Sequence, residues 1–257
     1  MFLKNLVIIF FTFCLLFVGN SFAKVKPETI VGIWLFDENV GNIAKDTSPN
    51  GKNNGILQEK PKWVQGKFGK ALEFDGTNGV EIANPEKFNF LTWTYVLWFK
   101  ADQGGDYPNL IGRQFANSHG WTIHLDPAGQ TFRIRIDTDG GINQVKTVPK
   151  NVRDGKWHHG AITHDDKNKK LEMYIDGVKG ETIYAGNYKN KGGSLKIASP
   201  AVGAVNLNKG AIDEVAIFNV LLTKDEITDI MKNGLEPLAS VSYLEKLACI
   251  WGTIKKR

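Results

Sequence analysis

Cysteine is nearly absent from this sequence: the 257 residues include only Cys14 and Cys249. Cys14 lies in an N-terminal segment that we expect to be removed, so one cysteine remains and no intrachain disulfide can form. A domain of this length buries enough apolar surface to be stable without cross-links. The shortage of cysteine therefore excludes a small fold held together by disulfides.

Long apolar runs are also scarce, because only Leu6–Val18 forms one. Lys4 precedes the run and small residues lead to Ala23, which is the charged, apolar and small order of a secretory signal peptide. The alternative is a membrane anchor, but a spanning helix needs about 20 apolar residues. We therefore expect residues 1–23 to be cleaved, and the mature protein to be secreted or at the cell surface with no membrane span.

Clustered positive charge is missing as well. The chain has 32 basic and 27 acidic residues. Without Lys4, 31 basic residues remain and the net charge is +4. These charges are scattered along the chain, whereas nucleic-acid-binding proteins gather them on one face or helix. The distribution indicates an ordinary solvated surface and no nucleic-acid partner.

Short runs with period-two alternation, separated by turn residues, fill most of the chain. In Phe132–Ile136 the alternation places Arg133 and Arg135 on one face of a strand and the apolar residues on the other. The run Leu91–Phe99 is apolar on both faces, as in a central strand covered on both sides. Asp-Gly turns end two of the runs. Regular short strands predict an all-β antiparallel sandwich, a two-sheet jelly roll in one domain.

One helix interrupts this pattern near the C-terminus. Thr223 and Glu226 have the spacing of a capping box, and Gly234 supplies a stop signal. We expect this short helix to cover an edge or end of the sandwich. The resulting organisation is a signal peptide (1–23), a jelly-roll domain (24–235) and a C-terminal tail (236–257).

Six motifs, occurring in a fixed order from about Ile30 to Leu235, resemble laminin-G-like (LamG-type), concanavalin A-like jelly-roll domains of secreted bacterial proteins. The resemblance implies two stacked, curved antiparallel sheets, and binding or adhesion more often than catalysis. It does not specify a ligand, because a fold does not determine a function. The motifs lie at residues 32–38, 46–55, 63–76, 157–159, 174–177 and 212–227.

Domains of this type often carry a structural calcium ion, and three acidic residues are candidate ligands for it: Asp37, Asp75 and Asp213. Asp213 shares a strand face with Ala211 and Val215, where a buried charge needs a partner. Calcium, a group of turn amides, or a Lys or Arg would each satisfy it. Ordinary turn chemistry is the alternative for Asp37 and Asp75.

Sugar binding requires exposed aromatic rings together with hydrogen-bonding side chains. Tyrosines in loops are less easily assigned to the core than tryptophans in strands, so we expect Trp34, Trp63, Trp93, Trp98 and Trp157 to be buried. Arg133 and Arg135 either line a groove or simply face solvent. The candidate ligand-binding residues are Tyr107, Arg113, His119, Arg133, Arg135, Tyr184 and Tyr188.

No catalytic constellation stands out in the sequence. A glycosidase needs two carboxylates across the scissile bond, and no strand carries the closely spaced pair that would supply them. The expected function is a secreted, non-catalytic module that binds a glycan or an extracellular protein. The alternatives are a carbohydrate-active enzyme (glycoside hydrolase or polysaccharide lyase) on the same fold, and a structural spacer or matrix protein.

Overall fold

The computed structural model describes residues 25–49, 51–102, 108–115, 119–126, 131–146, 150–189, 193–199 and 209–240. The predicted signal peptide, both cysteines, Tyr107 and residues 241–257 lie outside this set. Among the described helices, none is long and apolar enough to cross a membrane.

Strands make up about half of the described chain. In chain order they are β1 (Ile30–Trp34), β2 (Ile43–Ala44), β3 (Gly55–Gln58), β4 (Lys62–Gln65), β5 (Lys70–Phe74), β6 (Gly79–Ile82), β7 (Thr92–Ala101), β8 (Asn109–Phe115), β9 (His119–Leu125), β10 (Phe132–Thr138), β11 (Gly141–Lys146), β12 (Trp157–Asp165), β13 (Lys170–Ile175), β14 (Val178–Ile183), β15 (Leu195–Ile197) and β16 (Gly210–Phe218). The named helices are η1 (Pro27–Thr29), η2 (Pro85–Phe88) and α1 (Lys224–Asn233), and residues 236–240 are also helical.

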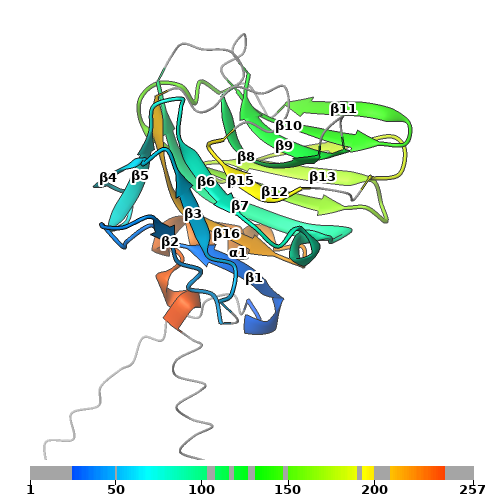
Figure 1. Cartoon of the computed structure of the whole chain (residues 1–257). Helices are drawn as coiled ribbons and strands as arrows, with labels where there is room; N and C mark the ends of the chain where they lie inside the picture. The colour runs from blue at the N-terminus through cyan, green and yellow to red at the C-terminus, as the bar shows by residue number, and fades with distance from the viewer. Residues whose placement is uncertain are drawn as a thin grey trace, which may run out of the picture.

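Two antiparallel sheets form stacked layers (Figure 1). Within the described residues each sheet has eight strands. Sheet A has the order β14-β13-β12-β7-β16-β5-β4, with β1 also pairing with β16, and sheet B has the order β11-β10-β9-β8-β15-β6-β3-β2. The predicted two-sheet sandwich is confirmed.

The main core lies between the sheets, and period-two alternation explains which side chains enter it. In β7, Trp93, Tyr95, Leu97 and Phe99 face this core. The intervening Val96 belongs to a second apolar cluster on the other face of sheet A, together with residues of β1, β16 and α1. Both faces of β7 are therefore covered along much of its length, as its sequence predicts.

Helix α1 begins and ends at the predicted residues. The Thr223 side chain accepts a hydrogen bond from the Glu226 amide, and the Glu226 carboxylate accepts one from the Thr223 amide. Ile227 and Ile230 are buried against the second cluster. In Figure 1 the helix lies beside β1 and β16, so it covers one part of the outer face of sheet A and leaves another part open.

Candidate functional site

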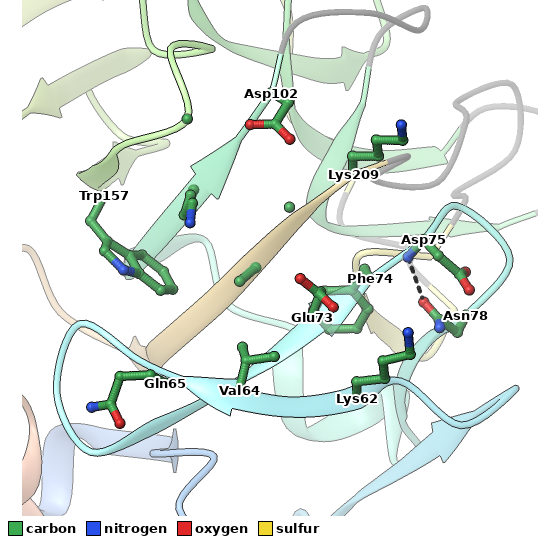
Figure 2. A pocket seen from close by; sticks show the side chains of 14 residues that line it. Lys62, Val64, Gln65, Glu73, Phe74, Asp75, Asn78, Asp102, Trp157 and Lys209 are labelled. Carbon is green, nitrogen blue, oxygen red and sulfur yellow. Dashed lines mark hydrogen bonds between the residues drawn. The ribbon is translucent and has the colours of Figure 1, made fainter.

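A groove of about 620 Å³ lies on the outer face of sheet A, and none of its lining residues belongs to α1 (Figure 2). Trp157 stands on one side of it, and Asp75 and Asn78 stand on the other. Its lining residues are Lys62, Val64, Gln65, Glu73, Phe74, Asp75, Asn78, Lys100, Asp102, Gly155, Trp157, Lys209, Gly210 and Ala211.

The register of sheet A builds the floor of this groove from five neighbouring strands. Lys62 pairs with Glu73, Glu73 with Ala211, Ala211 with Lys100, and Lys100 with Trp157. Cross-strand partners point to the same side of a sheet, so these five side chains form one row. Adjacent strands lie about 4.8 Å apart, which makes the row about 19 Å long. The small side chain of Ala211 leaves the middle of the floor low.

Five charged side chains line the groove without a partner among the described residues: Lys62, Glu73, Lys100, Asp102 and Lys209. None of them makes a side-chain hydrogen bond or ion pair with another residue that the structure describes. Charged groups left unpaired around a groove are free to bind a ligand without first breaking an internal contact. Their signs are mixed, so the groove presents both hydrogen-bond donors and acceptors.

Trp157 supplies the aromatic surface of the groove, and its expected place in the core is a wrong prediction. It is partly exposed and lines the groove. On β12, Gly160 and Ile162 lie on the face toward the main core, so alternation places Trp157 and His159 on the outer face. The same alternation places Trp98 on the outer face, where it is nevertheless buried as expected. Trp34 and Trp93 are buried in the main core as expected, and Trp63 is partly buried against it.

A second row of side chains lies next to the floor, under the loop 66–69. His159 pairs with Trp98, and Trp98 pairs with Asp213. The loop covers them: the Phe68 ring meets the Trp98 ring edge-on at 6.2 Å, and Lys67 Nζ lies 4.4 Å from the Trp98 ring centroid. The loop begins after Gln65, so this packing also supports one wall of the groove.

Asp213 holds that loop in place. Its Oδ2 accepts hydrogen bonds from the amides of Lys67 at 2.8 Å and Phe68 at 3.0 Å. Burial raises the pKa of Asp213 to about 7, and the two amides oppose the rise. A Cβ at Gly66 would lie 2.5 Å from Asp213 Oδ2, so only glycine allows this approach. Of the partners considered for Asp213, the structure contains the group of turn amides.

The adjacent Glu214 has a comparable role at a bulge in β16. Its carboxylate accepts a hydrogen bond from the amide of Leu235, just after α1. Burial raises the pKa of Glu214 to about 8. Neighbouring buried carboxyl groups thus fix the loop 66–69 on one side and the end of the helix on the other.

The three candidate calcium ligands do not form a common donor set. Asp37 Oδ1 accepts the amide of Lys70 at 2.7 Å, at the start of β5, whereas Asp75 follows the other end of that strand. Asp75 Oδ1 accepts the amide and hydroxyl of Thr77, which lower its pKa, so it has the turn role considered as its alternative. In the part of the chain that the structure describes, no three His, Cys, Asp or Glu side chains are placed to hold a metal ion.

Two of the tyrosines predicted to bind ligand are core residues. Tyr184 and Tyr188 are 4% and 8% exposed and pack in the main core. The hydroxyl of Tyr184 donates to Asp166 at 2.8 Å and lies 2.7 Å from His164 Nε2. The expectation that these loop tyrosines face solvent is therefore wrong, because backbone contacts hold the loop against the sandwich, from Tyr184 to Lys169 and from Tyr188 to Thr138 of β10.

The predicted arginines also have internal partners. Arg113 is fully buried, and its guanidinium donates to the carbonyls of Phe88 and Pro85, which fastens η2 to β8. Arg133 and Arg135 lie on the outer face of sheet B, where they meet Asp126 and Asp137, each at 3.4 Å.

None of the predicted ligand-binding side chains that the structure describes lines the groove. Tyr107 and the side chain of His119 lie outside the described residues. The sequence signal that identifies the groove is the phase of alternation at Lys62, Glu73, Lys100 and Trp157, combined with the pairing of their strands.

Comparison of the sequence with known proteins finds a distant relative. Sialidase B of Streptococcus pneumoniae is 26% identical over 163 residues, which are 56% of this chain and 23% of the sialidase. The chain therefore matches less than a quarter of that relative's length.

Solved structures share the fold. The binding domain of Paraclostridial Mosquitocidal Protein 1 superposes with a TM-score of 0.65 at 17% identity, over 79% of this chain and 52% of that one. Domain 4 of AbnA, a GH43 extracellular arabinanase from Geobacillus stearothermophilus solved with arabinotriose, gives 0.58 at 20% identity, over 79% and 98%. The binding domain of Botulinum Neurotoxin DC in complex with SialylT gives 0.60 at 15% identity, over 80% and 51%.

The model of one protein family matches residues 74–228, which include β7, β12 and β16 of the groove floor and helix α1 up to Thr228. That match covers more than half of the chain, and it agrees with the two stacked antiparallel sheets. The chain belongs to the Concanavalin A-like lectin/glucanases superfamily, in the Laminin_G_3 family.

Proposed function

We propose that this protein is a secreted, non-catalytic binding module that holds a glycan in the groove on sheet A. The main support is the groove itself, in which the partly exposed ring of Trp157 stands beside five charged side chains that have no partner in the part of the chain the structure describes. Sugars present apolar C–H faces that pack on aromatic rings, and hydroxyl groups that both donate and accept hydrogen bonds. The groove offers a surface for each.

The comparisons support the same class of function. Two of the similar structures were solved with a carbohydrate, arabinotriose in one and SialylT in the other. The arabinanase of which one forms a part is extracellular. Export of the present chain follows from its N-terminal segment, with cleavage after Ala23. The intact mass of exported protein tests this, because a chain that retains residues 1–23 contradicts it.

Binding is tested with residues 24–257 on an oligosaccharide array that includes arabinotriose and sialylated glycans. Trp157→Ala is expected to weaken binding about tenfold, the equivalent of about 1.4 kcal/mol. Ala211→Arg is expected to abolish it by filling the floor. Ile56→Ala, at an exposed site on sheet B, is the matched control and should bind like the wild type.

Two outcomes would move or remove the proposed site. Loss of binding in Arg133→Ala and Arg135→Ala, with Trp157→Ala unaffected, would place the ligand on sheet B instead. If the immobilised protein retains extracellular proteins but binds no glycan at any concentration, the protein-binding alternative would be favoured.

A carbohydrate-active enzyme is the second candidate, and one observation favours it. Glu73 and Asp102 are carboxylates in the same groove that no described residue pairs with, and glycosidases use two carboxylates. Release of shorter sugars from arabinotriose, or of free sialic acid from a sialylated glycan, would establish this alternative if Glu73→Gln abolishes it. With neither product formed, the binding proposal stands.

A further inference from the structure

His158 stands behind the aromatic wall of the groove with a carboxylate on each side of its ring. Its Nδ1 lies 2.8 Å from Asp176 Oδ2, and its Nε2 lies 3.0 Å from Asp154 Oδ1. The imidazole is only 7% exposed, whereas the two carboxylates are about one quarter exposed. Only an imidazolium can donate to both partners at once, because a neutral ring has one N–H and one lone pair.

These contacts enclose the residue that forms the wall. Asp154 and His158 are four residues apart, so their contact closes a short loop that contains Trp157 and Gly155, and both of these line the groove. The Asp154 carboxylate also accepts the amide of Lys156 at 3.0 Å. The start of β12 is thus fixed by a side-chain clasp as well as by strand pairing.

The other contact joins the clasp to sheet A. Asp176 lies in the turn between β13 and β14, and its Oδ1 accepts the amide of His159 at 2.8 Å. Lys150 Nζ lies 2.5 Å from Asp176 Oδ2. Because these bonds persist when His158 is neutral, the Asp176 side of the clasp is the more strongly held.

We infer that His158 is a positioning residue that holds the Trp157 wall of the groove in place only while its ring is protonated. When the ring loses its proton, one ring nitrogen carries a lone pair that faces a carboxylate oxygen, and the two repel. The contact of His158 with Asp154 is longer than the contact with Asp176, and Asp154 lies in the more exposed loop. The contact with Asp154 is therefore the one that opens. The loop 154–157 then loosens, and the groove loses its fixed aromatic wall.

Electrostatics around the ring agree with this reading. The hydrogen bond to Asp176 raises the pKa of His158, with a further contribution from Asp154, while burial opposes the rise. Burial disfavours ionisation of Asp176, but the hydrogen bonds from His158 and Lys150 outweigh it and lower its pKa. Lys156 Nζ lies 3.5 Å from Asp154, and the Phe99 ring of β7 lies 6.0 Å from the imidazole on the core side. The His158 ring is therefore expected to lose its proton, and the contact with Asp154 to open, at a pH above the usual range of histidine pKa values.

The test uses residues 24–257 labelled with 5-fluorotryptophan and needs no ligand. The Trp157 fluorine resonance, assigned with Trp157→Phe, is expected to move between pH 5.5 and 9 with the midpoint at which the His158 ring titrates. In His158→Gln and in Asp154→Asn this movement should disappear. Lys156→Gln removes a neighbouring charge without touching the imidazole, and it should keep the movement.

A Trp157 resonance that stays fixed while His158 titrates would overturn the inference, and so would movement that persists in both His158→Gln and Asp154→Asn. Melting curves test whether the variants are folded. If His158→Gln does not fold, Asp154→Asn carries the test, because it changes only an exposed turn. The inference rests on the proposed function in treating the groove as a binding site. Because no glycan is present, failure of this experiment leaves the array result unaffected, and failure of the array leaves this result unaffected.

Discussion

At the scale of single residues, the buried carboxyl group of Asp213 makes the stability of the fold depend on pH. Asp213 is fully buried, and two backbone amides occupy one of its oxygens. Its other oxygen, Oδ1, has no hydrogen-bond partner among the described residues. The carboxyl group is therefore easier to bury protonated than ionised, which is the reason that its pKa is raised.

Asp213→Asn is expected to remove one pH dependence from the free energy of unfolding. Between pH 3.8 and about 7 the folded Asp213 binds more protons than the unfolded one, so this group lowers stability as pH rises through that window. The asparagine keeps the acceptor for both amides and does not titrate. Urea unfolding at pH 8 should show the variant more stable than the wild type by about 1–4 kcal/mol.

Asp213→Ala is the contrasting variant, because it leaves the amides of Lys67 and Phe68 without an acceptor. It should be less stable than Asp213→Asn by about 2–3 kcal/mol at every pH, because neither variant titrates at this position. The same proteins test the calcium hypothesis. We expect a chelator to leave the melting temperature unchanged, and a decrease in the wild type that is absent from Asp213→Asn would instead show bound calcium.

At the scale of elements, helix α1 illustrates how local signals and packing combine. Its capping box satisfies amides that the helix leaves unpaired at its start. Its buried face is short and includes Ile227 and Ile230. A helix of ten residues is marginal by itself, so its stability comes from packing on β1 and β16.

Thr223→Ala should lower the free energy of unfolding by about 1 kcal/mol, the usual contribution of an N-cap side chain. Chemical denaturation measures the loss. Glu226→Gln keeps an acceptor for the Thr223 amide and is expected to lose less. A loss in Glu226→Gln as large as that in Thr223→Ala would indicate that the negative charge of Glu226 near the helix start contributes as much as the cap side chain.

For the whole molecule, acid is the condition that should destabilise the fold. Three buried histidines, His124, His159 and His164, have pKa values lowered to about 4 by burial. Between about pH 6.5 and 4 the unfolded chain takes up protons that these folded side chains do not. The histidine contribution to stability is therefore lost as pH falls through that window, and it opposes the trend from Asp213.

His159→Phe tests this balance. Neither ring nitrogen of His159 has a hydrogen-bond partner among the described residues, and its ring packs edge-on against Trp98. The variant should be at least as stable as the wild type at pH 7. Its loss of stability in acid should be shallower, by up to about 1.4 kcal/mol per pH unit, in urea unfolding from pH 4 to 7. An unchanged acid slope would contradict the burial of a neutral His159.

Much of the fold could be predicted from the sequence, because the signals are local. Alternation and turn residues predict the strands, and the pair Thr223 and Glu226 predicts the helix start that the structure contains. The need of Asp213 for a buried partner was also predicted, although the bulge between Asp213 and Ala216 turns Val215 into the main core and off the face that Asp213 occupies. The choice between an ion and turn amides was not, because the amides come from a loop about 145 residues earlier in the chain.

The sequence by itself determined which segments are strands and which residues alternate along them. Only the tertiary structure decided which face of each strand is covered, because that depends on segments distant in sequence. Tyr184 and Tyr188 are buried for that reason, and Trp157 is left partly exposed beyond the part of sheet A that α1 covers. The groove is likewise a product of strand pairing, since its floor takes one side chain from each of five strands that only the sheet brings together.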